Sequence, residues 1–146
     1  MLSHTELLES WEKDCLIDRT NLMSTMYGHP QLHGKYLTHL MTYKMNLRKS
    51  VMKYQSVRLL RQRYFNGEMT KEMLDEQGWN QYQIKKPLKS ELEALLDASP
   101  DLQLLQEKSV YIESMVHACE SIIKDINSRY FLFRSMVDYE KFQAGV

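Results

Sequence analysis

The sequence has few of the residues that interrupt helices or cross-link chains. Its 146 residues include five glycines, three prolines and two cysteines. So few helix breakers, together with many Met, Leu, Lys, Glu and Gln residues, favour a helical fold. Cys15 and Cys119 belong to no spacing motif. We therefore expect buried thiols in a reducing compartment rather than a disulfide framework.

Several functional classes are disfavoured by motifs that the sequence lacks. No uncharged apolar run approaches the ~18 residues of a membrane span, and the charged segment 1–14 lacks the apolar run of a signal peptide. We therefore expect a soluble, cytoplasmic protein. The absence of a Gly-rich phosphate loop argues against an ATP-driven recombinase or helicase. No nucleophile–base–acid arrangement stands out, so we expect neither enzymatic activity nor a cofactor.

Histidines are the only candidates for metal ligands. His29 and His33 have the four-residue spacing of one helix face, but Pro30 and Gly34 disrupt the helix that this spacing requires. No cysteine pair lies nearby to complete a zinc site. We therefore expect no metal centre.

Acidic residues are missing from one long stretch of an otherwise balanced chain. There is no Asp or Glu from Arg19 to Gly67, although the whole chain has 19 of them and no net charge. The stretch holds nine of the 19 basic residues: Arg19, Lys35, Lys44, Arg48, Lys49, Lys53, Arg58, Arg61 and Arg63. This local excess of positive charge favours a face that binds a polyanion. The alternative is a solvated charged face that binds nothing.

Helical periodicity begins close to the N-terminus. Ser3 and Glu6 have the spacing of a capping box, and helical spacing then continues to Met26. Asp18 would lie on the apolar side of this first helix, where we expect it to pair with a buried partner. A break is expected at residues 28–34, where two glycines and a proline interrupt the pattern.

A second helix is expected from Lys35 to Phe65, closed by the turn at Asn66-Gly67. Its main apolar stripe is Tyr36, Leu40, Tyr43, Leu47, Val51, Tyr54 and Val57, and a second apolar group lies at least a quarter-turn away: Leu37, Met41, Met45, Met52 and Leu59. A helix that is apolar over so much of its girth needs a helical partner, in the same chain or in another copy.

The remainder divides into an acidic connection and a last helix. Thr70 and Ser90 have the spacing of helix caps within residues 68–100, and Ser99-Pro100-Asp101 is a strong start signal for a helix. The last helix, 101–143, carries a coiled-coil-like stripe: Ile112, Met115, Cys119, Ile122, Ile126, Tyr130 and Phe133. A long helix with such a stripe must pack along its length, so we expect these residues to mediate oligomerisation.

These segments predict an all-α protein of long helices that forms a single domain, 1–146. Residues 1–67 form a helical hairpin with the basic helix, 68–100 an acidic connection, and 101–143 the oligomerisation helix. The candidate DNA-binding residues are Lys44, Arg48, Lys49, Lys53, Arg58, Arg61, Arg63 and Tyr64. Lysines and arginines bind phosphates. Tyr64 and Phe65 either stack on bases or pack in the core.

Five short segments carry a resemblance to a known family. Residues 14–22 are similar to the pattern Asp-x-x-Ile-Asp-Ser-Thr-x-Leu, 32–37 to Leu-Tyr-x-Lys-Trp-Leu, and 64–67 to Tyr-Tyr-x-Gly. Residues 89–105 begin like Lys-Ser-Glu-Met, and 128–145 resemble Ser-Arg-Gly-Phe-x-Ile-Lys followed by Phe-x-Ala-Gly. In this order, they resemble the UvsY family of bacteriophage recombination mediators.

The sequence departs from the family pattern at two places. Leu59-Leu60-Arg61 stands where the family has Lys-x-Arg, so only Arg61 carries over, with Arg58 beside it. Tyr130 replaces the glycine after Ser-Arg.

The resemblance implies a non-enzymatic protein that binds single-stranded DNA and assembles into a ring-like homo-oligomer, a hexamer or heptamer. Such a protein helps a RecA-like recombinase replace single-strand-binding protein on DNA during recombination, repair and replication, here in the cytoplasm of an infected bacterium. The alternative is a helical scaffold or adaptor whose basic face binds an acidic protein.

Overall fold

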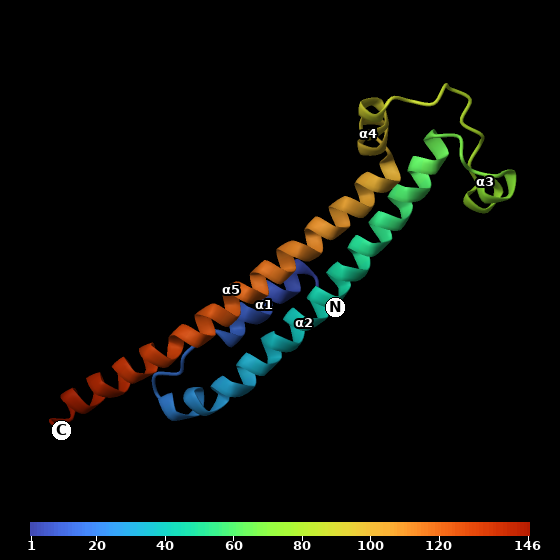
Figure 1. Cartoon of the computed structure of the whole chain (residues 1–146). Helices are drawn as coiled ribbons and strands as arrows, with labels where there is room; N and C mark the ends of the chain where they lie inside the picture. The colour runs from blue at the N-terminus through green and yellow to red at the C-terminus, as the bar shows by residue number, and fades with distance from the viewer. The chain divides into compact units, whose positions relative to one another are not determined.

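The computed structural model describes all 146 residues, and its secondary structure consists of helices alone. The helices are α1 (His4–Asp14), α2 (Leu22–Phe65), α3 (Lys71–Gln77), α4 (Lys89–Asp97) and α5 (Pro100–Gln143) (Figure 1). The all-α prediction is therefore confirmed. No helix combines the length and the apolarity needed to cross a membrane.

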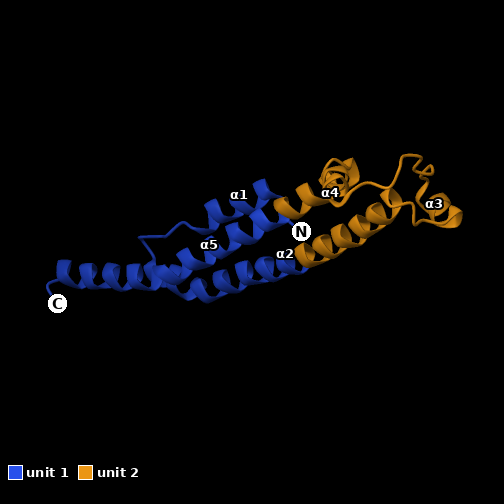
Figure 2. Ribbon diagram, turned by 45° about the horizontal axis from the view of Figure 1, so that its top comes forward, with its two compact units in different colours: residues 1–45, 112–146 blue, residues 46–111 orange.

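The chain divides into two compact units, and α2 and α5 contribute to both. Unit 1 comprises residues 1–45 and 112–146, and unit 2 comprises residues 46–111 (Figure 2). Unit 1 thus contains α1, the first half of α2 and most of α5. Unit 2 contains the rest of α2, α3, α4 and the first turns of α5.

The first helix begins where the sequence predicts but ends early. Ser3 Oγ accepts the Glu6 N–H at 3.3 Å, and the Glu6 carboxylate accepts the Ser3 N–H at 2.7 Å, which completes the capping box. The prediction of helical structure through Met26 is wrong, because α1 ends at Asp14.

Asp18 explains why the two helices are separate. Its Oδ1 accepts the N–H groups of Thr20 and Asn21 at 2.9 and 3.3 Å, and its side chain is exposed. The expected buried partner is therefore absent. A carboxylate that binds the backbone two and three residues ahead stabilises a turn in place of a continuous helix.

The second helix begins earlier than predicted, at Leu22 instead of Lys35, and runs through Pro30 and both nearby glycines. Its first turns bend away from the axis that follows (Figure 1), as expected around a proline inside a helix. His29 holds this segment in place. It is 3% exposed, and its Nε2 lies 2.8 Å from the Ile126 carbonyl oxygen.

The core of unit 1 contains the first part of the α2 stripe and the apolar stripe of α5. Tyr36, Tyr43, Met115, Cys119 and Ile126 have no exposed surface. The expected core position of the two tyrosines is therefore confirmed. Each buried hydroxyl donates a hydrogen bond, Tyr36 to Asp14 at 3.0 Å and Tyr43 to the Leu2 carbonyl at 3.2 Å. Burial raises the pKa of Tyr36 to about 12.

The stripe predicted to mediate oligomerisation lies mostly inside this core. Six of its seven members are at most 5% exposed, and only Tyr130, at 54%, reaches the surface. The six are Ile112, Met115, Cys119, Ile122, Ile126 and Phe133. They stabilise the chain itself, so they cannot contact a second chain unless this core opens.

Unit 2 has a smaller core of its own. Leu92, Leu96 and Leu102 are buried there, and Tyr54, Val57 and Phe65 pack against them. The predicted cap of α3 is confirmed, because Thr70 Oγ1 accepts the Met73 N–H at 3.3 Å. The predicted cap at Ser90 is wrong. The backbone N–H of Leu88 binds Glu91 at 3.0 Å, so α4 begins at Lys89.

We predict that Ile126→Ala destabilises the protein by about 2–5 kcal/mol, because it leaves a cavity in the core of unit 1. Leu104→Ala is the matched control, since Leu104 also lies on α5 and is 67% exposed. It should change the free energy of unfolding by no more than about 0.5 kcal/mol. Urea denaturation followed by circular dichroism measures both. Equal destabilisation by the two variants would show that the Ile126 side chain is not in a packed core.

Candidate nucleic-acid interface

The predicted DNA-binding cations of α2 divide into two groups by helix face. At about 3.6 residues per turn, Lys44, Arg58 and Arg61 lie on or next to the face that packs in the core. Each of them forms an ion pair. The other group lies on the opposite side of the helix, exposed to solvent: Arg48, Lys49, Lys53 and Arg63. None of these four takes part in an ion pair.

The paired cations meet acids from elements that the sequence does not place near them. Lys44 Nζ lies 2.9 Å from Glu120 in unit 1, and the hydrogen bond from Lys44 lowers the pKa of Glu120. In unit 2, Arg58 binds Glu93 of α4. Both pairs are substantially exposed, so each contributes little to the stability of the fold.

Arg61 is the most enclosed of the paired cations. Its Nε donates to Asp101 Oδ2 at 2.9 Å, and its side chain is 19% exposed. Its guanidinium carbon also lies 3.9 Å from the centroid of the Trp79 ring and 5.6 Å from that of Tyr64. These contacts fix Arg61 as part of unit 2, so it reaches a phosphate only if the ion pair breaks.

Tyr64 and Phe65 belong to an aromatic cluster in unit 2. The Tyr64 ring centroid lies 5.3 Å from those of Phe65 and Trp79 and 5.5 Å from that of Tyr82. Phe65 also packs against the buried leucines. In this chain, both rings therefore have protein partners. The sequence reasoning missed Trp79 and Tyr82, because no spacing rule links them to the end of α2.

The unpaired cations form the candidate site, which we call the outer face of α2. It consists of Arg48, Lys49, Met52, Lys53, Leu59 and Arg63, all in unit 2. It extends over about 22 Å at 1.5 Å per residue. No carboxylate occurs anywhere on α2. A polyanion can therefore bind these cations without displacing an acid.

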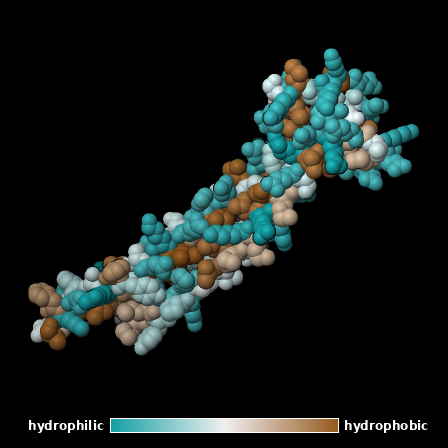
Figure 3. Space-filling model, viewed as in Figure 1, coloured by the Kyte–Doolittle hydropathy of each residue, from teal (hydrophilic) through white to brown (hydrophobic).

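Apolar side chains lie among these charges. Met52 and Leu59 are 57% and 51% exposed. Figure 3 shows exposed hydrophobic side chains in separate patches among hydrophilic ones on the face in view. The outer face therefore offers both charge and apolar contact.

The sequence alone predicts, in part, which face of α2 each cation occupies. Arg61 follows Tyr54 by seven residues and Val57 by four, so helical spacing alone places it on the apolar stripe. The acids that pair with Arg58 and Arg61 come from α4 and α5, which only the fold brings to α2.

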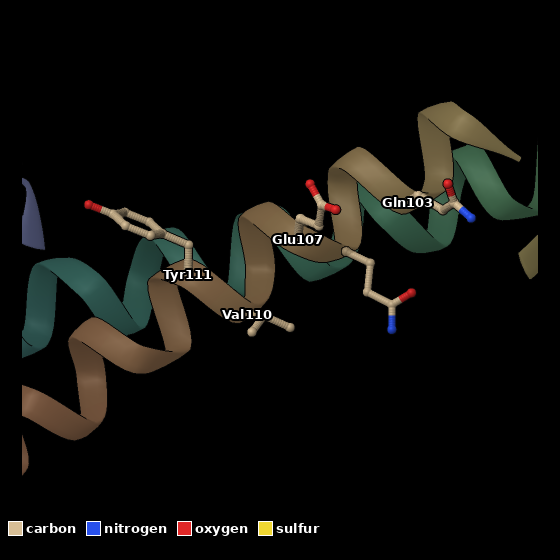
Figure 4. Close-up of a pocket in the computed structure, with 5 residues that line it drawn as sticks. Gln103, Glu107, Val110 and Tyr111 are labelled. Carbon is tan, nitrogen blue, oxygen red and sulfur yellow. The ribbon is translucent and has the colours of Figure 1, made fainter.

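A hollow along α5 offers no comparable site. A hollow of about 650 Å³ is lined by Gln103, Gln106, Glu107, Val110 and Tyr111. All five belong to α5, so this is a strip along one helix rather than a cavity between elements (Figure 4). No group of three or more His, Cys, Asp and Glu side chains is placed to hold a metal ion.

The fold and the outer face together define a class: an all-helical protein with an unpaired cationic helix face. A family model described as "Recombination, repair and ssDNA binding protein UvsY" matches residues 10–146. The chain therefore belongs to the UvsY family. No curated protein sequence matches it significantly.

Solved structures with the same fold come from bacteriophage T4. One crystal structure of the T4 recombination mediator protein UvsY, lattice type II, is 21% identical, covers 99% of both chains and has a TM-score of 0.86. Another, lattice type IV, is 19% identical, covers 97% of this chain and 99% of that one, and has a TM-score of 0.82. At these identities, the likeness establishes the shared fold.

We predict that Asp101→Asn destabilises unit 2 by about 1–3 kcal/mol, because it leaves the charge of Arg61 partly buried without its acid. Glu93→Gln is the matched control. It also removes one acid from an arginine pair, but Glu93 is 51% exposed, so the destabilisation should stay below about 1 kcal/mol. Urea denaturation followed by tryptophan fluorescence measures both. If Glu93→Gln costs more, Arg61 is not the enclosed partner.

Proposed function

We propose that the chain is a recombination mediator that binds single-stranded DNA through the outer face of α2. One observation carries the proposal: four exposed cations without acidic partners share one face of a helix that has no carboxylate. Phosphate binding to such a face releases the counterions of the strand without the cost of breaking ion pairs. Membership of the UvsY family, whose description includes recombination, repair and ssDNA binding, supports this assignment.

The mixture of charge and apolar surface favours a single strand over a duplex. Met52 and Leu59 lie between the cations and are about half exposed. The bases of a single strand are free to contact such side chains, whereas a duplex presents mainly its phosphates along the outside. Lys44, Arg58, Arg61 and Tyr64 have a secondary role, because their protein partners compete with the DNA.

Oligomerisation would raise the affinity of the outer face for DNA. Four cations per chain bind weakly at physiological salt, but a ring-like homo-oligomer presents many such faces to one strand, and effective concentration then raises the avidity by orders of magnitude. The exposed apolar residues left for subunit contacts include Phe131 and Phe142 on α5, which are 77% and 80% exposed.

The proposed role as a recombination mediator implies two further protein partners. A strand held along many outer faces is withdrawn from single-strand-binding protein and presented, extended, to a RecA-like recombinase. The T4 protein with the same fold is named a recombination mediator, which supports this pathway. The chain itself needs no chemical step for it, only binding and release.

We predict that Lys49→Ala with Lys53→Ala reduces the slope of log affinity against log salt by about 1.4, because each phosphate of a single strand that binds a cation contributes about 0.7 to that slope. Fluorescence anisotropy with a labelled oligonucleotide at several salt concentrations measures the slope. Lys108→Ala with Lys124→Ala removes the same charge from exposed positions of α5 and should leave the slope unchanged.

Two other outcomes would reject this assignment. Equal slopes for both double variants would place the DNA site elsewhere on the chain. Failure of the unaltered protein to bind any oligonucleotide at about 0.1 M salt, where screening is moderate, would favour an adaptor that binds an acidic protein through the same face.

For assembly, we predict that Phe131→Glu with Phe142→Glu lowers the molar mass in solution and weakens DNA binding together. Both side chains are exposed, so the helical circular dichroism signal should not change. Light scattering with and without a single-stranded oligonucleotide measures the mass. If the unaltered chain is a monomer and still binds a strand tightly, avidity is not the source of its affinity.

A further inference from the structure

A second hollow in unit 2 lies where α3 meets the segment that follows it. Its volume is about 560 Å³, within the range of roughly 300–1,000 Å³ typical of small-molecule sites. Its lining residues are Met69, Lys71, Leu74, Asp75, Trp79, Asn80 and Gln81. We propose that this hollow binds a nucleobase of the strand whose phosphates lie on the outer face of α2. This inference rests on the proposed function.

Trp79 provides a stacking surface that is already fixed in place. Gly78 adopts the left-handed conformation, with φ 68°, and the Trp79 N–H donates to the Leu74 carbonyl at 2.9 Å, as in a Schellman motif. Arg61 lies 3.9 Å from the ring centroid, yet it does not line the hollow. Trp79 itself lines the hollow and is only partly buried, so part of its side chain is open to a ligand. Because the protein already orders the Trp79 ring, stacking a base on this ring costs little additional side-chain entropy.

The lining chemistry suits a base edge better than a phosphate. Asp75 contributes a carboxylate, which repels phosphate but accepts hydrogen bonds from base amino groups. Asn80 and Gln81 contribute amides that both donate and accept, so they can turn to meet any base. The hollow should therefore bind bases with little sequence preference. Lys71 on its wall is available to the adjoining phosphate.

The hollow is also close in the chain to the last cation of the outer face. The Arg63 carbonyl accepts the Glu68 N–H at 2.9 Å across the turn at Gly67, and Met69, the next residue, lines the hollow. Only the turn at Gly67 separates Arg63 from the hollow along the chain, so a strand that leaves Arg63 can continue into the hollow. This closeness along the chain would let one strand use both surfaces.

The test uses Trp79 as its own probe. The chain has two tryptophans, so Trp11→Phe leaves Trp79 as the only one. This variant is titrated with a single-stranded oligonucleotide and with an abasic strand of the same length, which has the same phosphates but no bases. We expect the base-bearing strand to quench Trp79 fluorescence and the abasic strand to leave it unchanged.

Affinity provides a second readout. In the unaltered background, Asn80→Ala with Gln81→Ala and, separately, Trp79→Leu should weaken binding of the base-bearing strand. For Trp79→Leu, the removal of stacking corresponds to about 5- to 150-fold weaker binding. Both variants should bind the abasic strand as the unaltered protein does. The double variant changes only exposed residues, so it remains informative if Trp79→Leu disturbs the aromatic cluster.

The outcomes separate this inference from the proposed function. If both strands bind and quench Trp79 equally, or if the variants weaken both strands alike, the nucleobase site is rejected while DNA binding stands. If neither strand binds, the proposed function fails, and the nucleobase site fails with it.

Discussion

The burial of one apolar stripe of α5 determines most of the architecture of unit 1. A 44-residue helix cannot leave such a stripe in water, and here α1 and α2 cover it. Met115, Cys119 and Ile126 have no exposed surface once this packing is complete. The same packing keeps residues 22–34 helical in spite of Pro30, because His29 binds the Ile126 carbonyl oxygen and packs edge to face against the rings of Tyr130 and Phe133.

The orientation of α2 then decides which cations are available. With Tyr36 and Tyr43 turned inward in unit 1, and Tyr54 and Val57 packed on the buried leucines in unit 2, helical spacing places Arg48 and Lys49 outward. Positive charge on the packed side is neutralised by Glu93, Asp101 and Glu120. This moderate number of free cations agrees with the proposed function, in which each chain would release DNA readily while an assembly would hold it.

Unit 2 combines charge with aromatic rings. Arg61 is held between Asp101 and Trp79, and Tyr64, Trp79 and Tyr82 pack edge to face or tilted at 5.3 to 5.5 Å. Residues that resemble a DNA-binding motif in the sequence are thus partly structural in the fold. Their cluster in turn fixes one wall of the hollow beside α3.

The sequence by itself determined the helical class, the basic and acid-free character of α2, and the starts of α1, α3 and α5. Each of these depends on local composition or on a cap that binds within a few residues, as at Ser3 and Thr70. The tertiary structure alone decided three other matters: the helical state of residues 22–34, the enclosure of the α5 stripe within one chain, and the division of the cations into paired and free groups. These depend on contacts between residues 35 to almost 100 positions apart, such as Arg58 with Glu93 and His29 with Ile126, and no local pattern encodes such a contact.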